Sequence, residues 1–330
     1  MKVRAIYNNC EHGSTLNLVM FNSTHTFVGV ALARTLPNGW LRHAVVTAVI
    51  ASNLPDIDLV SGIPGTPTYM QYHRGITHSL AGVVILSLIL TVAMYWFSGN
   101  FWKTFAVALV AMITHPLLDF ANNYGWRPFL PFDGTWYYGD TLFIIDPYLD
   151  VILLAGILTG RYFKTFKQTL ACASILLAMV YIYLRVDLHN EARIQLGRFA
   201  ATIPGVERLA VLPEMVNPFM WDGIVETDRD ILKVSISALD GVGSELARMP
   251  RGNSSEIITR AADTVSVMAF AGFARFPITR IQGERFGYRV TFLDFRYYDE
   301  TSGSGFAADV ELDKSLNVVK ESLGFNQMID

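Results

Sequence analysis

Two long apolar runs joined by a short turn constrain this chain more than any other feature. Residues 79–97 and 101–118 are almost entirely apolar, and Ser98-Gly99-Asn100 separates them. Each run approaches the ~20 residues that a helix needs to cross a bilayer. The whole chain is 52% hydrophobic and 17% charged, whereas soluble domains carry roughly 25% charged residues. We therefore predict a helical hairpin embedded in a membrane.

Shorter apolar segments flank this hairpin. The sequence predicts helices over residues 25–35, 40–53, 147–160 and 169–184. Thr24 is a suitable N-cap for the first of them, and Pro147 suits the first turn of the third. The first two segments are each too short to span a bilayer alone, so they form either a tight hairpin or one broken span. We favour the hairpin, because it returns Asp56 to the side of His25.

The character of the sequence changes near residue 186. A helix is expected over residues 189–201 and another over 257–270, with strands over 231–239 and 288–298 and a hairpin over 307–321. The predicted fold is a mainly α membrane domain in residues 20–185, with about four to six embedded helices, followed by a small α+β soluble domain in residues 186–330. Residues 1–19 are polar and irregular, and we expect a disordered N-terminal extension there.

Histidine and aspartate residues gather at the ends of the apolar segments. Asp56 and Asp58 open a Gly/Pro-rich loop at residues 54–77, and His73 and His78 stand at its far end. Imidazole and carboxylate are the ligands that zinc, manganese and iron take from proteins. Two carboxylates one residue apart can approach one ion or bridge two. Counting crossings places all these groups on one side of the membrane.

Further residues of the same types are expected on that side. His115 and Asp119 stand four residues apart, so they project from one helical face. His25 and Asp146 each precede an apolar helix. Taken alone, each has an ordinary explanation as a helix-start residue, an N-cap or a local hydrogen bond. Their convergence after separate crossings favours a metal site, whose predicted ligands are His25, Asp56, His73, His78, His115 and Asp119.

Charge sets the expected orientation and excludes one class of partner. The turns opposite the site carry the basic residues, which the positive-inside rule assigns to the cytoplasm: Arg34, Arg42, Lys103, Arg161, Lys164 and Lys167. The site and the C-terminal domain would then face outward. A net charge of -3 gives no reason to expect a nucleic acid partner. Protein partners and the oligomeric state are left open.

The motifs together resemble the membrane-bound metal-dependent hydrolase family of bacteria, the YdjM/YfhP-like inner-membrane proteins. The resemblance covers residues 20–150 and rests on Thr24-His25, Leu54-Pro55-Asp56-Ile57-Asp58, His73-Arg74-Gly75-Ile76-Thr77-His78-Ser79, His115-Pro116-Leu117-Leu118-Asp119, Tyr138-Gly139-Asp140 and Ile145-Asp146-Pro147. It implies a multi-pass protein of the bacterial inner membrane with hydrolase activity. The family is also distantly similar to zinc-dependent phospholipase C and nuclease enzymes, an analogy that suggests cleavage of a phosphate ester.

The expected function is hydrolysis of a lipid or lipid-linked phosphate ester at the bilayer surface. One or two divalent ions, zinc first and manganese second, would activate a water molecule. Asp58 or Asp146 would serve as general base or orient the ligands. Arg74 would hold a phosphate, although an interfacial arginine is an equal reading. The alternatives are a membrane metal-binding or transport protein without hydrolysis, and an adaptor whose C-terminal domain binds a partner while the metal is structural.

Overall fold

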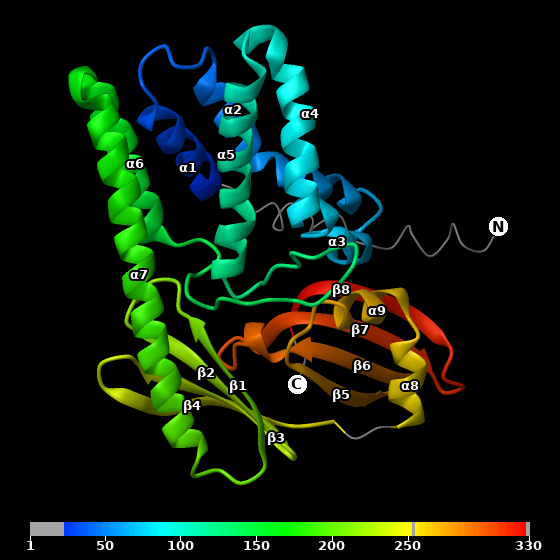
Figure 1. Cartoon of the computed structure of the whole chain (residues 1–330). Coiled ribbons are helices and arrows are strands. Elements are labelled where there is room, and N and C mark those ends of the chain that lie inside the picture. The colour runs from blue at the N-terminus through cyan, green and yellow to red at the C-terminus, as the bar shows by residue number, and fades with distance from the viewer. Residues whose placement is uncertain (1–22, 253–254, 328–330) are drawn as a thin grey trace, which may run out of the picture.

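A computed structural model describes residues 23–252 and 255–327 and separates a helical part from a β-rich part (Figure 1). The segment predicted as a disordered extension lies outside the described residues. The longer helices are α1 (Ser23–Thr35), α2 (Ala44–Asn53), α4 (Leu80–Ser98), α5 (Phe101–Ala121), α6 (Pro147–Tyr162) and α7 (Lys167–Ala200). A helical domain followed by an α/β domain confirms the predicted fold class.

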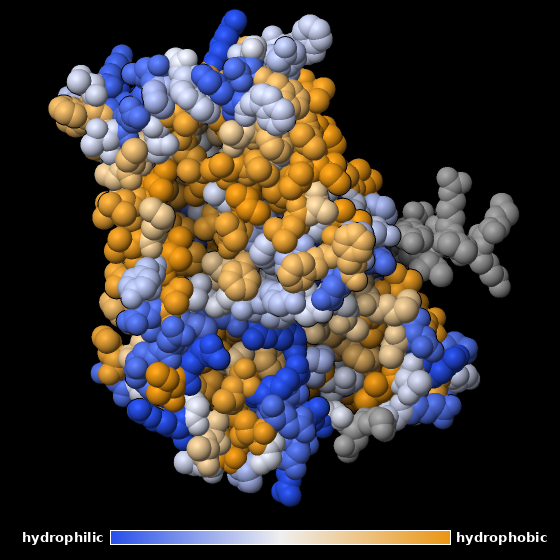
Figure 2. Space-filling model, viewed as in Figure 1, coloured by the Kyte–Doolittle hydropathy of each residue, from blue (hydrophilic) through white to orange (hydrophobic). Residues whose placement is uncertain are grey.

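Four segments in the described residues are long and apolar enough to cross a membrane: Ala44–Gly62, Leu80–Ser98, Phe101–Ala121 and Lys164–Ala200. The first joins α2 to a 3₁₀ helix, η4 (Leu54–Gly62). Helices α1 and α6 have 13 and 16 residues and pack against α7. Figure 2 shows a broad apolar band over the helices, with hydrophilic residues above and below it. The band fits insertion into a bilayer.

The predicted hairpin is formed by α4 and α5, and local chemistry explains its limits. Ser79 caps α4 by accepting a hydrogen bond from the amide of Gly82 at 3.0 Å. Gly99 adopts a φ of 72°, a left-handed conformation that glycine accepts without a Cβ clash. Asn100 then caps α5 through the amide of Lys103. Two caps and one glycine therefore reverse the chain within the turn.

Two predictions about element boundaries were wrong. The loop expected at residues 54–77 contains η4, the helix α3 (Thr66–Tyr72) and a 3₁₀ turn, η5 (Ile76–His78). Pro55 and Pro67 occupy the first turns of η4 and α3, where a missing N–H costs little. The separate helices expected at 169–184 and 189–201 are one helix, α7. Arg185 does not end it, because this buried side chain donates to the carbonyls of Thr141 and Pro218 and lies over Trp221.

The C-terminal part contains two antiparallel sheets, each with its strands in chain order. The first packs against the polar half of α7, which runs along it in Figure 1. Its strands are β1 (Val206–Pro213), β2 (Met220–Thr227), β3 (Asp230–Ser237) and β4 (Gly241–Pro250). The second packs against α8 (Glu256–Ala262) and α9 (Val265–Ala271) and consists of β5 (Pro277–Glu284), β6 (Gly287–Asp294), β7 (Ser304–Asp313) and β8 (Val318–Gln327).

The sequence reading of this part located β3, β6, β7 and β8 but did not predict β1, β2, β4 and β5. The predicted strand at 231–239 is β3, and the predicted hairpin at 307–321 is β7 and β8. The helix expected over 257–270 is divided into α8 and α9, because Thr264 has an extended conformation with a ψ of 153°. The strand expected over 288–298 ends at Asp294, and the short helix η7 (Phe295–Tyr297) follows.

Residues 122–146, here called the inter-domain loop, lie between the helices and the second sheet (Figure 1). Arg296 donates a 2.7 Å hydrogen bond to the carbonyl of Asn123. Arg275 pairs with Asp140 through both carboxylate oxygens, at 2.9 and 2.7 Å. The indole of Trp136 donates to the carbonyl of Gly272 at 3.0 Å. The soluble domain is therefore attached to the loop that lies beside the predicted site.

Candidate metal centre

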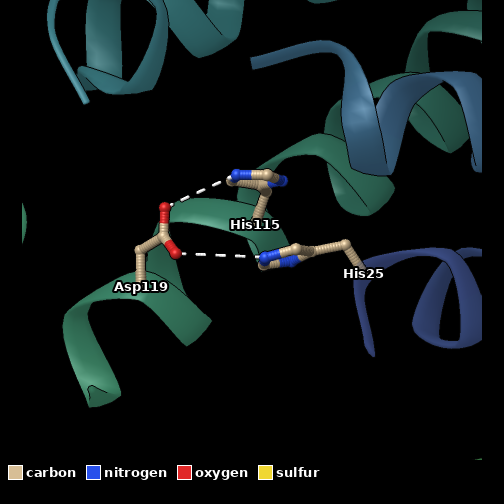
Figure 3. A group of neighbouring side chains, drawn as sticks. All are labelled: His25, His115 and Asp119. Atoms are coloured by element: carbon tan, nitrogen blue, oxygen red, sulfur yellow. Dashed lines mark ion pairs between the residues drawn. The ribbon is translucent and has the colours of Figure 1, made fainter. Parts of the chain in front are cut away.

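The six predicted metal ligands converge at one end of the helical bundle. His25 comes from the first turn of α1, and Asp56 belongs to η4. His73 follows α3, and His78 ends η5. His115 and Asp119 lie one turn apart on α5, as their spacing predicted. Figure 3 shows Asp119 beside the stacked rings of His115 and His25, with one carboxylate oxygen toward each ring.

Four of these side chains form a compact set, here called the metal quartet (Asp56, His78, His115 and Asp119). Nε2 of His78 lies 3.2 Å from Oδ1 of Asp56 and 3.2 Å from Nε2 of His115. Nε2 of His115 lies 3.4 Å from Oδ1 of Asp56. Oδ2 of Asp119 lies 3.5 Å from Nε2 of both histidines. A tetrahedral zinc ion with ligand bonds of about 2.0–2.1 Å has ligands about 3.3–3.4 Å apart. Five of the six ligand–ligand distances in the quartet therefore match those of a tetrahedral site.

The other ring nitrogens explain why both Nε2 atoms point into the quartet. Nδ1 of His115 lies 2.7 Å from the carbonyl oxygen of Ser52, which can only accept a hydrogen bond. Nδ1 of His78 lies 3.2 Å from Oδ2 of Asp58. Donation from each Nδ1 leaves the lone pair on Nε2, the arrangement that orients metal-binding histidines in known sites.

Asp119 carries the clearest sign that a cation is expected. Its Oδ1 forms a 2.7 Å ion pair with Nη2 of Arg74. Its Oδ2 is buried and, within the described part of the chain, has no hydrogen-bond partner. A buried carboxylate oxygen without a partner is costly. A divalent ion among the quartet would satisfy it, so the residues present fit a metal.

Asp58 lies beside the quartet and orients it. Its Oδ2 accepts hydrogen bonds from the hydroxyl of Thr77 at 3.1 Å and the backbone amide of Arg74 at 3.0 Å, and it also faces His78. Its Oδ1 lies 3.1 Å from Nδ1 of His73. The carboxylate is thus already used by four neighbours. Asp56, Asp58 and His73 nevertheless form a second group with metal-ligand spacing, which shares Asp56 with the quartet.

His25 reaches the site without entering the quartet. Its ring stacks on His115 with 3.7 Å between centroids, and its Nε2 lies 3.9 Å from Oδ1 of Asp119. His25, His115 and Asp119 also have metal-ligand spacing. Because Nδ1 of His115 faces Ser52, this group and the quartet would use the same Nε2 of His115. The two groups are therefore alternative positions for one ion.

His73 and His78, which both lie outside the candidate membrane spans, have opposite electrostatic settings. Burial disfavours the charged form of His78, but its hydrogen bonds to Asp56 and Asp58 outweigh burial and raise its pKa to about 9. Burial lowers the pKa of His73, and the pairing with Asp58 opposes that shift without cancelling it. In the ion-free protein, a proton on His78 therefore balances part of the carboxylate charge that a cation would otherwise balance.

The site opens into a cavity of about 90 Å³. Its polar lining includes His25, Asp56, His73, Arg74 and Asp146. Its apolar lining includes Leu59, Leu118, Leu142, Phe143, Ile144 and Leu149. A cavity lined by both metal-ligand groups and aliphatic or aromatic groups suits an amphiphilic ligand.

Arg74 and Asp146, the other predicted site residues, have structural partners. Arg74 is buried, lies over Tyr124, and donates to Asn122 and to the carbonyl of Gly125 as well as to Asp119. Asp146 caps α6 by accepting from two backbone amides, and Tyr181 donates to both of its oxygens at 3.0 and 2.9 Å. Asp146 lines the same cavity as Asp56 but belongs to no group with metal-ligand spacing in the described residues.

Sequence reasoning missed several groups that hold the ligands. Ser52, Thr77, Tyr181 and the residues around Arg74 were not singled out. Thr77 adjoins His78 in the sequence, and this position could have suggested that its hydroxyl forms a hydrogen bond within the site. The roles of the Ser52 carbonyl and of Tyr181 depend on helix packing, which leaves no mark in the local sequence.

Comparison with known proteins gives three results. The model of the YdjM inner membrane protein family matches residues 20–191, and that of the YfhP C-terminal alpha/beta plait domain matches residues 256–328. The chain is 27% identical over 293 residues to the "Uncharacterized protein YfhP" of Bacillus subtilis (strain 168), covering 84% of this chain and 87% of that protein. No solved structure matches the chain. The YdjM family match includes all six predicted ligands and covers more than half of the chain. The protein therefore belongs to the YdjM inner membrane protein family.

Proposed function

We propose that the protein is a membrane-bound metal-dependent hydrolase that cleaves a lipid or lipid-linked phosphate ester. The single observation that carries the proposal is the metal quartet, with five of its interatomic distances between 3.2 and 3.5 Å. Oδ2 of Asp119, which is buried and has no hydrogen-bond partner in the described residues, supports a cation there. Its mixed nitrogen and oxygen donors and its tetrahedral dimensions favour zinc, with manganese as the alternative.

The residues around the quartet would divide the remaining tasks. A divalent ion in such a site supplies Lewis acidity and lowers the pKa of water toward neutrality. Asp146 is the better candidate for general base, because within the described residues its Oδ2 accepts a hydrogen bond only from Tyr181, whereas Asp58 is used by four neighbours. Of the arginines that the structure describes, Arg74 alone lines the cavity, so a phosphate oxygen entering the cavity would meet this cation.

The cavity supports the class of substrate. Its apolar lining residues would contact the first part of a hydrocarbon chain, and its polar lining residues would contact the phosphate next to the ion. The metal quartet draws its residues from the ends of membrane segments rather than from their middle. That position favours chemistry at the surface over transport across the membrane, since a translocation path needs polar residues at midspan.

We also propose that the site and the soluble domain lie on the outer face of the inner membrane. The basic turns at the opposite ends of the helices are packed together: Lys103 donates to the carbonyl of Trp40, and Lys167 donates to Asn38. A cluster of basic residues is expected on the cytoplasmic side. A reporter enzyme that is active only outside the cytoplasm should be active when fused after residue 330, and an inactive fusion of a stably produced protein would reverse the orientation.

The function is tested with purified full-length protein. Metal-free protein should take up zinc or manganese and then hydrolyse a model phosphomonoester or a short-chain phospholipid. The His78→Ala, His115→Ala double variant should lose both metal and turnover. His43→Ala is the matched control, because His43 is exposed at the opposite end of the bundle. Full activity in the double variant would refute the proposal, and metal binding without turnover of any ester would favour a metal-binding or transport role.

A further inference from the structure

Several large apolar side chains are exposed outside the membrane spans, on the side that bears the metal centre. Phe132 is 92% exposed, Val216 is 68% exposed and Ile76 is 58% exposed. They belong to three different segments: the inter-domain loop, the β1–β2 turn, and η5. Exposed apolar groups that gather at one level of a molecule mark an interaction surface. Their hydrogen-bonded neighbours determine where that level is.

Two of these segments are tied to the start of α4. The backbone amide of Leu80 donates a 3.0 Å hydrogen bond to the carbonyl of Pro128, directly before Phe129. The amide of Phe132 closes a turn onto the carbonyl of Phe129 at 2.9 Å. The carbonyl of Ile76 accepts a 2.7 Å hydrogen bond from the hydroxyl of Ser79, the N-cap of α4. These aromatic and aliphatic groups therefore lie where a membrane-spanning helix begins.

The β1–β2 turn reaches the same level from the soluble domain. The hydroxyl of Tyr148, in the first turn of α6, donates to the carbonyl of Val216 at 2.7 Å. Arg185 donates to the carbonyl of Pro218 in the same turn. Arg185 directly follows the apolar half of α7. The turn is thus held at the start of α6 and at the middle of α7, where the apolar half of α7 ends, and it includes the exposed Met215 and Phe219.

The composition of these segments indicates what covers them. Residues 129–132 and 215–219 contain phenylalanine, leucine, methionine, valine, proline and asparagine, but no lysine or arginine. Attraction to anionic lipid headgroups requires basic residues, so it does not explain this surface. Shallow burial of apolar groups at the boundary between headgroups and acyl chains does, and the surface continues the apolar exterior of α4, where Val84 and Leu88 are exposed.

We infer that these residues form a lipid-inserted collar, defined as Ile76, Phe129, Phe132, Met215, Val216 and Phe219. The collar seats the soluble domain on the bilayer, with the two turns inserted about 5–10 Å into the interface. His78 lies between Ile76 of the collar and the first residue of α4, so the metal quartet is at headgroup depth. The collar agrees with a lipid substrate for the proposed hydrolase, but it rests on neither metal binding nor turnover.

The experiment places one fluorophore at a time on the full chain in lipid nanodiscs. The starting variant carries Cys10→Ser and Cys172→Ser, which removes both native cysteines. Phe132→Cys and Val216→Cys are then labelled with an environment-sensitive dye. Leu239→Cys is the matched control, since Leu239 is 70% exposed in a turn of the same domain. The carbonyl of its neighbour Ala238 accepts a hydrogen bond from the side chain of Gln195. Gln195 is ten residues beyond Arg185 on α7, so the control label lies about 15 Å farther along the helix than the level of the collar.

The collar predicts a loss of fluorescence at positions 132 and 216 when the nanodiscs contain lipids with a nitroxide just below the headgroup. The emission maxima of the labels at 132 and 216 should lie at shorter wavelength than that of the label at 239. Aqueous iodide should quench only the label at 239. The result should be the same in zwitterionic and anionic lipid. Labels at 132 and 216 that behave like the control, or insertion that requires anionic lipid, would overturn the inference. Ile76→Cys provides a third position if one variant does not purify as folded protein.

Discussion

Arg74 and Asp119 form a buried ion pair that uses one carboxylate oxygen of Asp119. The other oxygen is directed toward His78 and His115 of the metal quartet. Nη2 of Arg74 lies 2.7 Å from Oδ1, while Oδ2 lies 3.5 Å from the Nε2 atoms of His78 and His115. Asp119 therefore combines two roles: a partner for a fixed guanidinium and a ligand candidate with a set direction. The arrangement makes Arg74 important even where it does not touch a substrate.

Replacing Arg74 should weaken metal binding. Without the guanidinium, the Asp119 carboxylate loses its orientation, and partners that orient metal ligands are typically worth about 10–100-fold in affinity. We expect Arg74→Gln to bind zinc with an affinity lower by about that factor, measured by competition with a chelating dye. Arg161→Gln, an exposed change in the opposite basic turn, is the control. Equal affinities in both variants would show that Arg74 does not orient Asp119.

Asp56 and Asp58 should respond differently to the same substitution. Asp56→Asn changes a member of the metal quartet, whereas Asp58→Asn changes a group that receives hydrogen bonds from Thr77 and Arg74 and faces His73 and His78. We expect loss of the ion in the first variant and an affinity lower by about 10–100-fold in the second. Elemental analysis after dialysis and dye competition measure the two outcomes. A larger loss of metal affinity in Asp58→Asn than in Asp56→Asn would mean that Asp58 is the metal ligand and that Asp56 orients the site.

The Asp146 cap should matter for stability without affecting the ion. Asp146 accepts the amides of Tyr148 and Leu149 and the hydroxyl of Tyr181. Loss of an N-cap costs about 0.5–2 kcal/mol, so Asp146→Ala should lower the thermal midpoint, while Asp146→Asn preserves most of it. Both variants should bind zinc normally. If Asp146 is the general base, Asp146→Asn should lose turnover while keeping the metal; loss of zinc in Asp146→Asn would instead make it a ligand.

The Asp140–Arg275 pair predicts a pH-dependent loss of stability. Burial raises the pKa of Asp140, although Arg275 opposes the shift. Arg275→Met leaves a buried carboxylate unpaired, which costs about 3–5 kcal/mol at neutral pH. The folded-state pKa then rises further above the unfolded value, so the cost falls as the pH is lowered through it. Thermal unfolding at about pH 7 and about pH 5 measures this effect.

Arg229→Met serves as the control for that prediction, since the Arg229 side chain is 90% exposed and its nearest carboxylate is 4.0 Å away. It should lose little stability at either pH. A loss for Arg275→Met that is the same at both pH values would mean that Asp140 remains charged or becomes solvated.

The sequence predicted the parts of the site that depend on local spacing. His115 and Asp119 lie on one helical face because they are four residues apart. The helical hairpin followed from two apolar runs and a turn. These features are encoded within short stretches, where periodicity and capping residues decide the outcome.

Other features depended on distant contacts and could not be predicted. In the sequence, Arg185 marks the end of an apolar run. In the structure α7 continues through it, because its side chain donates hydrogen bonds to the carbonyls of Thr141 and Pro218 and lies over Trp221. Asp58 resembles Asp56 in sequence, and only the positions of His73 and Thr77 separate their roles. In each case the deciding partner lies on another element and becomes visible only after packing.

The unbroken length of α7 has a mechanical consequence. Its 34 residues make a rod of about 50 Å, whose upper half is apolar and whose lower half forms the core beside β1–β4. A change in bilayer thickness that tilts the upper half must displace the sheet at the other end. Through Arg185, the same displacement reaches Thr141, within a few residues of the cavity wall. The stiffness of one helix would thus transmit a change in the physical state of the surrounding lipid to the cavity wall.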